Sequence, residues 1–166
     1  MPTVASSVAE LLGLLKGSAR VAGERLVIDD ERAFRSSGIR DLAWTAAFTR
    51  DEPTAEVARW IVWEASQELG ARSASIHELY AARARGEWDG FTVPAINIRA
   101  QTFDMARIVF ETAARNEAGA VILELARSEQ TYTFQRVQDY ATSVLAGAIA
   151  AGWRGPVFIQ GDHYQF

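Results

Sequence analysis

Three short apolar segments, separated by helical patterns, constrain the fold of this chain more than any other feature. They span residues 91–98, 118–126 and 155–160. Nearly continuous apolar strands that alternate with amphipathic helices are typical of parallel sheets covered by helices. From residue 90 onward, the sequence therefore predicts consecutive βαβ units with right-handed crossovers.

Polar residues gather where each of the three predicted strands ends. In chain order they are Asn97, Glu124, Arg127, Ser128, Glu129, Asp162 and His163. The carboxyl ends of parallel strands meet at one edge of the sheet, and α/β folds place their functional residues there. We therefore expect these side chains to form a site.

Two α/β folds begin in this way. A doubly wound sheet normally carries a glycine-rich phosphate loop after its first strand, whereas the turn at residues 97–102 contains no glycine. A (β/α)8 barrel needs no such loop. We therefore expect the first three strands of a (β/α)8 TIM barrel, in a domain that starts at residue 90 and is incomplete at residue 166.

Residues 1–89 have a mainly helical pattern, which predicts an N-terminal extension in front of the barrel. Ser7 and Glu10 form a capping-box signature, and apolar residues at every fourth position predict a helix over residues 53–69. Trp60 and Trp63 are expected to pack in a core or an interface.

Composition excludes several classes of protein. The net charge of −4, with basic residues scattered among acidic ones, gives no general attraction to nucleic acids or anionic membranes. The chain has no cysteine, so any metal would need nitrogen and oxygen ligands. No apolar run approaches the roughly 20 residues that span a bilayer. Because Glu10 and Lys16 interrupt the first apolar stretch, we expect a cytoplasmic protein without a signal peptide.

The motifs VPAINI, GAVILELARSE and GPVFIQGDH, all within residues 91–166, resemble the opening of a known family. They are similar to class II, zinc-dependent fructose-bisphosphate and tagatose-bisphosphate aldolases, and in particular to a bacterial aldolase-like branch with a helical N-terminal extension. The resemblance implies a homo-oligomeric barrel enzyme that cleaves a phosphorylated ketose to dihydroxyacetone phosphate and an aldehyde.

The resemblance also implies roles for individual residues. Asp162 corresponds to the catalytic acid/base and His163 to a ligand of Zn²⁺, while Asn97 corresponds to a residue close to the triose phosphate. The small or serine residue that follows the second strand in the family corresponds to Ser128 or Ala126.

The chemistry of aldol cleavage accounts for the Asp-His pair. Cleavage removes a hydroxyl proton, which a carboxylate such as Asp162 can accept, and it leaves negative charge that a zinc ion stabilises. A neutral imidazole such as that of His163 is a good zinc ligand. Adjacent residues of a strand point to opposite faces, so both can serve one site only if the backbone turns; Gly161 is expected to allow that turn.

The family's remaining histidine and glutamate ligands and its phosphate-binding loops lie on later strands. His77, in the first turn of another predicted helix, is expected at the surface and does not replace them. The resemblance thus implies an N-terminal fragment that is inactive alone. Two other hypotheses stay open: a non-catalytic, barrel-type subunit, and a small α/β interaction protein whose uncovered last strand leaves an open sheet edge.

Overall fold

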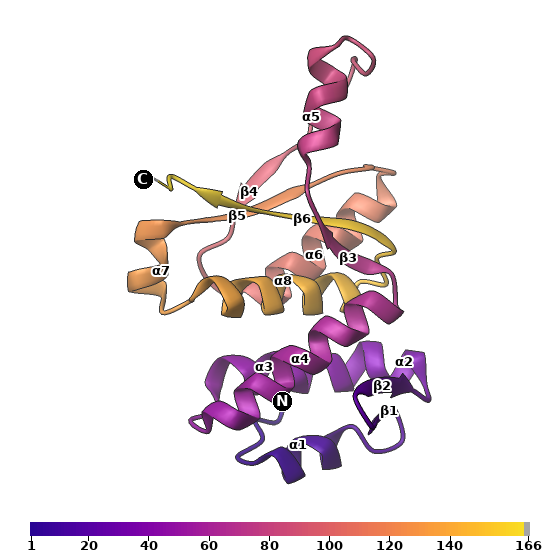
Figure 1. Ribbon diagram of the computed structural model, residues 1–166, viewed down its shortest axis with the longest axis vertical. Coiled ribbons are helices and arrows are strands. Elements are labelled where there is room, and N and C mark those ends of the chain that lie inside the picture. The colour runs from indigo at the N-terminus through magenta and orange to yellow at the C-terminus, as the bar shows by residue number, and fades with distance from the viewer. Residues whose placement is uncertain (165–166) are drawn as a thin grey trace.

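The computed structural model describes residues 1–164, and its N-terminal part consists of helices and a two-stranded hairpin (Figure 1). In chain order these elements are α1 (Val8–Leu14), β1 (Ala19–Ala22), β2 (Arg25–Ile28), α2 (Glu31–Ala33), the π-helix η1 (Phe34–Gly38), α3 (Ile39–Phe48) and α4 (Glu52–Glu68). As predicted, Ser7 caps α1: its hydroxyl accepts a hydrogen bond from the N–H of Glu10 at 3.3 Å.

The remaining elements alternate strands with helices. They are β3 (Ala71–Ala74), α5 (His77–Ala84), β4 (Ala95–Asn97), α6 (Thr102–Arg115), β5 (Ile122–Ala126), α7 (Arg127–Thr133), α8 (Val137–Ala150) and β6 (Gly155–Asp162). The last four of the strands form one parallel sheet in the order β3-β6-β5-β4. The predicted α/β fold with consecutive parallel strands is therefore confirmed, and β4, β5 and β6 are neighbours in chain order.

The strand β3 lies in a part of the chain where the pattern predicted helices. Its residues pair with β6 from Ala71↔Gly155 to Ala74↔Phe158. Of the four residues of β3, only Ala71 is buried. The strand is therefore held mainly by its backbone hydrogen bonds to β6. Because most of its side chains are exposed, its sequence has no apolar pattern that would predict a strand.

Helices α6 and α8 cover one face of the sheet, as Figure 1 shows. Leu123, Leu125 and Val157 point to this face and belong to the main hydrophobic core. The two helices approach closely at Gly147, where a Cβ would lie 2.8 Å from each of Ala106 Cβ, Arg107 N and Phe103 O. Glycine at this position is what allows the close contact.

One hydrophobic core joins the N-terminal helices to the sheet. Leu11 and Ile61 lie in the same buried cluster as Phe110 and Ile149. Helix α4 packs on α8, which is itself packed on the sheet. Residues on both sides of the predicted boundary at residue 90 thus contribute to one core.

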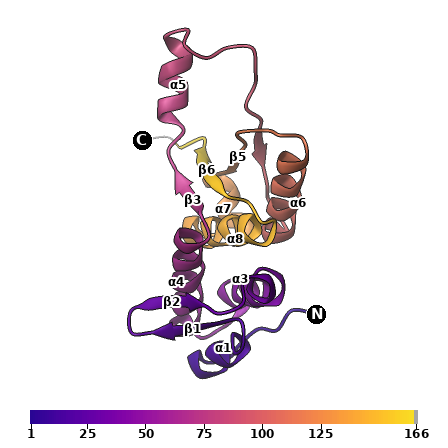
Figure 2. The same cartoon turned by 90° about the vertical axis from the view of Figure 1, so that its right-hand side faces the viewer.

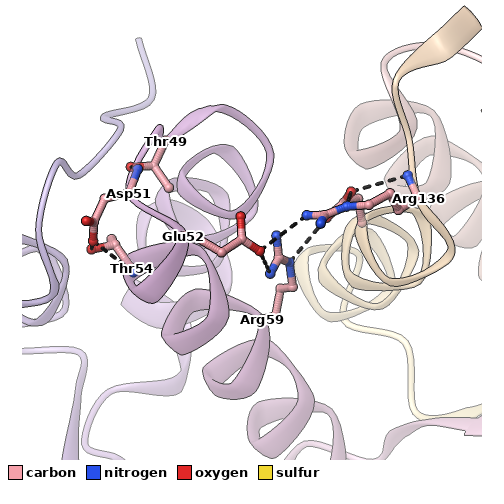
Figure 3. Close-up of polar contacts among 7 residues, drawn as sticks. Thr49, Asp51, Glu52, Thr54, Arg59 and Arg136 are labelled. Atoms are coloured by element: carbon pink, nitrogen blue, oxygen red, sulfur yellow. Dashed lines mark hydrogen bonds and ion pairs between the residues drawn. The ribbon is translucent and has the colours of Figure 1, made fainter. Parts of the chain in front are cut away.

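A ring of four charged side chains fastens the start of α4 to the start of α8 (Figure 3). The Arg59 guanidinium lies 3.0 Å from the Glu52 carboxylate and 3.2 Å from that of Asp139. Arg136 lies 3.4 Å from Glu52 and 3.0 Å from Asp139. Arg59 and Asp139 are largely buried, so water and salt screen their attraction less than that of an exposed pair.

The segment with α5 rises from the face of the sheet opposite α6 and α8, as the two views in Figures 1 and 2 agree. It connects the two edge strands β3 and β4, and α5 has no buried residue. His77, the first residue of α5, is exposed, as predicted. Among the described residues, no helix combines the length and the apolar character needed to cross a membrane.

Candidate active site

Polar side chains lie at the carboxyl edge of the sheet, on the face opposite α6 and α8. The register pairs Asn97 with Glu124 and Glu124 with Gln160, and one step further along it pairs Ala126 with Asp162. Leu123 and Leu125 point to the helices, so strand alternation puts these polar residues on the other face. The Gln160 amide donates to the Glu124 carboxylate at 3.1 Å. The structure thus brings two of the predicted site residues, Asn97 and Asp162, to one face.

Asp162 and His163 lie together at the end of β6. The His163 Nε2 atom is 3.2 Å from Asp162 Oδ1, and the Asp162 side chain is 30% exposed whereas that of His163 is 77% exposed. The backbone turns at His163 itself, whose φ is 73°. A histidine tolerates this left-handed conformation better than most residues, and such outliers concentrate at functional sites.

The turn at His163 corrects the role predicted for Gly161. Gly161 stays within β6 and continues the strand. A Cβ at this position would collide with the ring of Tyr164, which folds back over the glycine. The hydroxyl of Tyr164 accepts a hydrogen bond from Gln130 of α7. Gly161 therefore provides room for the Tyr164 ring, and the change of direction comes two residues later.

Glu129 connects the ends of β4 and β5. Its carboxylate, 5% exposed, accepts hydrogen bonds from the Ala126 N–H at 2.9 Å, from Asn97 Nδ2 at 2.8 Å and from Arg99 Nε. Burial acts to raise the pKa of the Glu129 carboxyl, but these hydrogen bonds and the charge of Arg99 outweigh it and lower the pKa to about 2. Glu129 is ionised at neutral pH.

The position of Glu129 was not recognised as central from the sequence, although a signal exists. It lies three residues after the N-cap Ala126, where a glutamate commonly returns to the cap N–H. Ser128, predicted to bind substrate, is exposed in the first turn of α7. The side chain that reaches back to the strand ends is that of its neighbour Glu129.

The orientation of the Asn97 amide is set by Glu129. Because Nδ2 donates to the carboxylate, Oδ1 points elsewhere, and within the described residues this buried oxygen has no hydrogen-bond partner. An unpaired buried acceptor costs about 1–3 kcal/mol. Rotation of the amide would bring two acceptors together, so the ionised Glu129 holds Asn97 in one orientation.

The side chains at this edge include atoms that can bind zinc. The exposed imidazole of His163 is a suitable ligand, and Asp162 and Glu124 supply carboxylates on the same strand ends. However, no group of three or more potential ligands converges anywhere within residues 1–164. Structural zinc sites use four protein ligands and catalytic ones about three. The described residues therefore do not form a complete zinc site.

No family model, curated protein or solved structure matches this chain. The features that bear on function are therefore the arrangement of side chains at the strand ends and the three motifs that carry them.

Proposed function

We propose that residues 91–164 form the opening of a class II ketose-bisphosphate aldolase, with Asp162 as the acid/base and His163 as one metal ligand. The observation that supports this most directly is the Asp162–His163 contact of 3.2 Å at the carboxyl end of a parallel strand. Strand ends in α/β folds are where functional residues gather. The predicted Asn97 lies on the same face.

The order of the strands supports the barrel part of the proposal. β4, β5 and β6 are parallel neighbours in chain order, with α6 and α8 on one side, and this is the repeating unit of a (β/α)8 barrel. In such a barrel the next strand would pair with β6 along the edge that β3 holds here. The proposal therefore requires β3 to leave that edge in the closed barrel.

The reaction uses Asp162 for proton transfer. Its carboxylate accepts the proton of the C4 hydroxyl of a ketose bisphosphate, the O–H electrons form the aldehyde carbonyl, and the C3–C4 bond breaks. The electrons of that bond form a C2=C3 double bond and move the C2 carbonyl electrons onto oxygen, giving an enediolate. C3 then takes up the proton held by Asp162, which yields dihydroxyacetone phosphate and restores the carboxylate. A divalent metal, for which His163 would supply one ligand, stabilises negative charge of this kind. Further ligands would have to come from outside the described residues.

The decisive experiment uses the natural gene product that contains this chain. Release of dihydroxyacetone phosphate from fructose 1,6-bisphosphate and from tagatose 1,6-bisphosphate is measured with zinc present. Asp162→Asn should lower kcat by about 10²–10⁴ and keep the zinc, whereas His163→Ala should lose zinc and activity together. Asp89→Asn, an exposed acid in the segment before β4, is the control and should behave as the wild type. Absence of cleavage with both substrates, or normal turnover by Asp162→Asn, would exclude the proposal.

A further inference from the structure

A second site lies beside the strand ends, next to the end of α7. It is a cavity of about 820 Å³ between the end of α3, the β4–α6 loop and the α7–α8 connection. Its volume is in the range of small-molecule sites. The wall includes the buried Phe103 and four more accessible aromatic side chains, which are Trp44, Phe48, Tyr132 and Phe134.

Three of these aromatic side chains are unusually exposed. Phe48 is 62% exposed, Tyr132 61% and Phe134 90%. Trp44 and Phe48 are paired, with ring centroids 5.0 Å apart. Because two of these rings come from α3 and two from the end of α7, and all four line one hollow, they offer flat surfaces to a guest, in contrast to a scatter of single exposed residues.

The two loops of the cavity are held in costly backbone conformations. Gln101 has a φ of 52° and Phe134 a φ of 54°, both in the left-handed region. The side chain of Gln135 ties the loops together: its Oε1 accepts from Thr102 Oγ1 at 2.5 Å, and its Nε2 donates to the Arg99 carbonyl at 2.9 Å. Left-handed non-glycine residues persist where the surrounding structure fixes them, commonly at ligand sites.

Arg99 gives the cavity a cationic group. Its guanidinium is 62% exposed, and within residues 1–164 its only hydrogen bond is from Nε to Glu129, which leaves both Nη groups for a guest. The acid Asp139, also in the wall, is already paired with Arg59 and Arg136. The other wall acid, Asp104, is half-exposed in the first turn of α6, where the helix N-terminus favours negative charge.

We propose that this cavity binds a planar aromatic molecule with an anionic substituent, the ring lying against Phe134 and Trp44 and the anion on the Arg99 guanidinium. Binding at this site does not require the proposed aldolase activity. The site is nevertheless connected to the strand ends, because Arg99 binds Glu129 and Glu129 holds the Asn97 amide. A guest bound to Arg99 would therefore change the environment of the Asn97 side-chain amide.

The test uses naphthalene-2-carboxylate, titrated into the chain by calorimetry. Phe134→Gly removes a ring that is 90% exposed and replaces it with the residue that suits a φ of 54°, so this variant should fold at least as well as the wild type. Tyr80→Ala removes a half-exposed aromatic residue of α5 that is outside the cavity, and it serves as the matched control. Arg99→Gln removes the cationic group.

Naphthalene-2-carboxylate should bind the wild type and Tyr80→Ala equally, and Phe134→Gly and Arg99→Gln about tenfold more weakly. The neutral naphthalene-2-carboxamide and the non-aromatic cyclohexanecarboxylate should also bind about tenfold more weakly to the wild type. Binding should shift the NMR signals of the Asn97 side-chain NH2 group. Equal affinity of the wild type and Phe134→Gly, or equal affinity for carboxylate and carboxamide, would overturn the proposal whether or not the protein is an aldolase.

Discussion

Replacing Gly147 by alanine should destabilise the protein, because α6 and α8 meet at this residue. The added Cβ would lie 2.8 Å from two backbone atoms and one Cβ of α6, well inside normal contact distance. Backbone atoms of a packed helix cannot move aside as a side-chain end can, so the two helices must separate. Overpacking of this kind costs about 1–3 kcal/mol, and three simultaneous contacts place Gly147→Ala at the upper end.

Alanine also favours a helix over glycine by about 1 kcal/mol, which opposes the clash. The net loss should therefore be about 2 kcal/mol, or about 4–8 °C in Tm for a chain of this size. Gly13→Ala is the matched control, since Gly13 lies in α1 and a Cβ there would meet nothing within 4 Å. It should stabilise the protein by about 0.5–1 kcal/mol.

Urea unfolding followed by circular dichroism measures both variants against the wild type. The two substitutions are chemically identical and both fall in helices, so only the environment can give them opposite signs. If Gly147→Ala were as stable as the wild type, or gained as much as Gly13→Ala, the close packing of α6 on α8 would be wrong.

Two other predictions concern the strand ends. The pKa of Glu129 is lowered to about 2 from an ordinary 4.5, so its ionised form adds stability above about pH 4.5 that is lost as the pH falls toward 2. The difference in unfolding free energy between the wild type and Glu129→Gln should thus be constant above pH 5 and shrink below pH 4.5. A difference that is unchanged at pH 2.5 would refute the lowered pKa of Glu129. Gly161→Ala should cost less than about 1 kcal/mol, because the ring of Tyr164 can swing away, but NMR should show that this ring has moved; an unchanged ring would contradict the packing at Gly161.

The parallel sheet could be predicted because its central strands are buried and therefore apolar. In β5, Leu123 and Leu125 are covered by the helices, while Ile122 on the other face is buried as well, so the pattern is continuous. A strand that is buried on both faces can be recognised in the sequence as an uninterrupted run of apolar residues. The strand β3 could not be predicted because three of its four residues are exposed and its stability comes from backbone pairing with β6.

The site was predictable where it depends on strand ends and not where it depends on side chains that meet across the fold. The placement of Asn97 and Asp162 on one face at the sheet edge could be predicted because each follows an apolar run. The contact of Glu129 with Asn97 joins residues 32 positions apart, and no local pattern specifies such a pair. The turn at His163 was assigned to Gly161 because glycine is the usual residue for a positive φ, whereas here glycine is needed for space beside Tyr164.

The pairing of β3 with β6 also has a consequence for how the chain folds. The units β4-α6-β5 and β5-α8-β6 can form from neighbouring stretches of chain, whereas β3 must wait for a partner roughly half the chain length away. Closing so long a loop costs conformational entropy before any stabilising contact forms. Contacts between residues far apart in the sequence therefore slow folding. During synthesis β3 leaves the ribosome well before β6 exists, so it spends that interval unpaired. Its short length and exposed Arg72 are features that discourage such an edge from pairing with another chain.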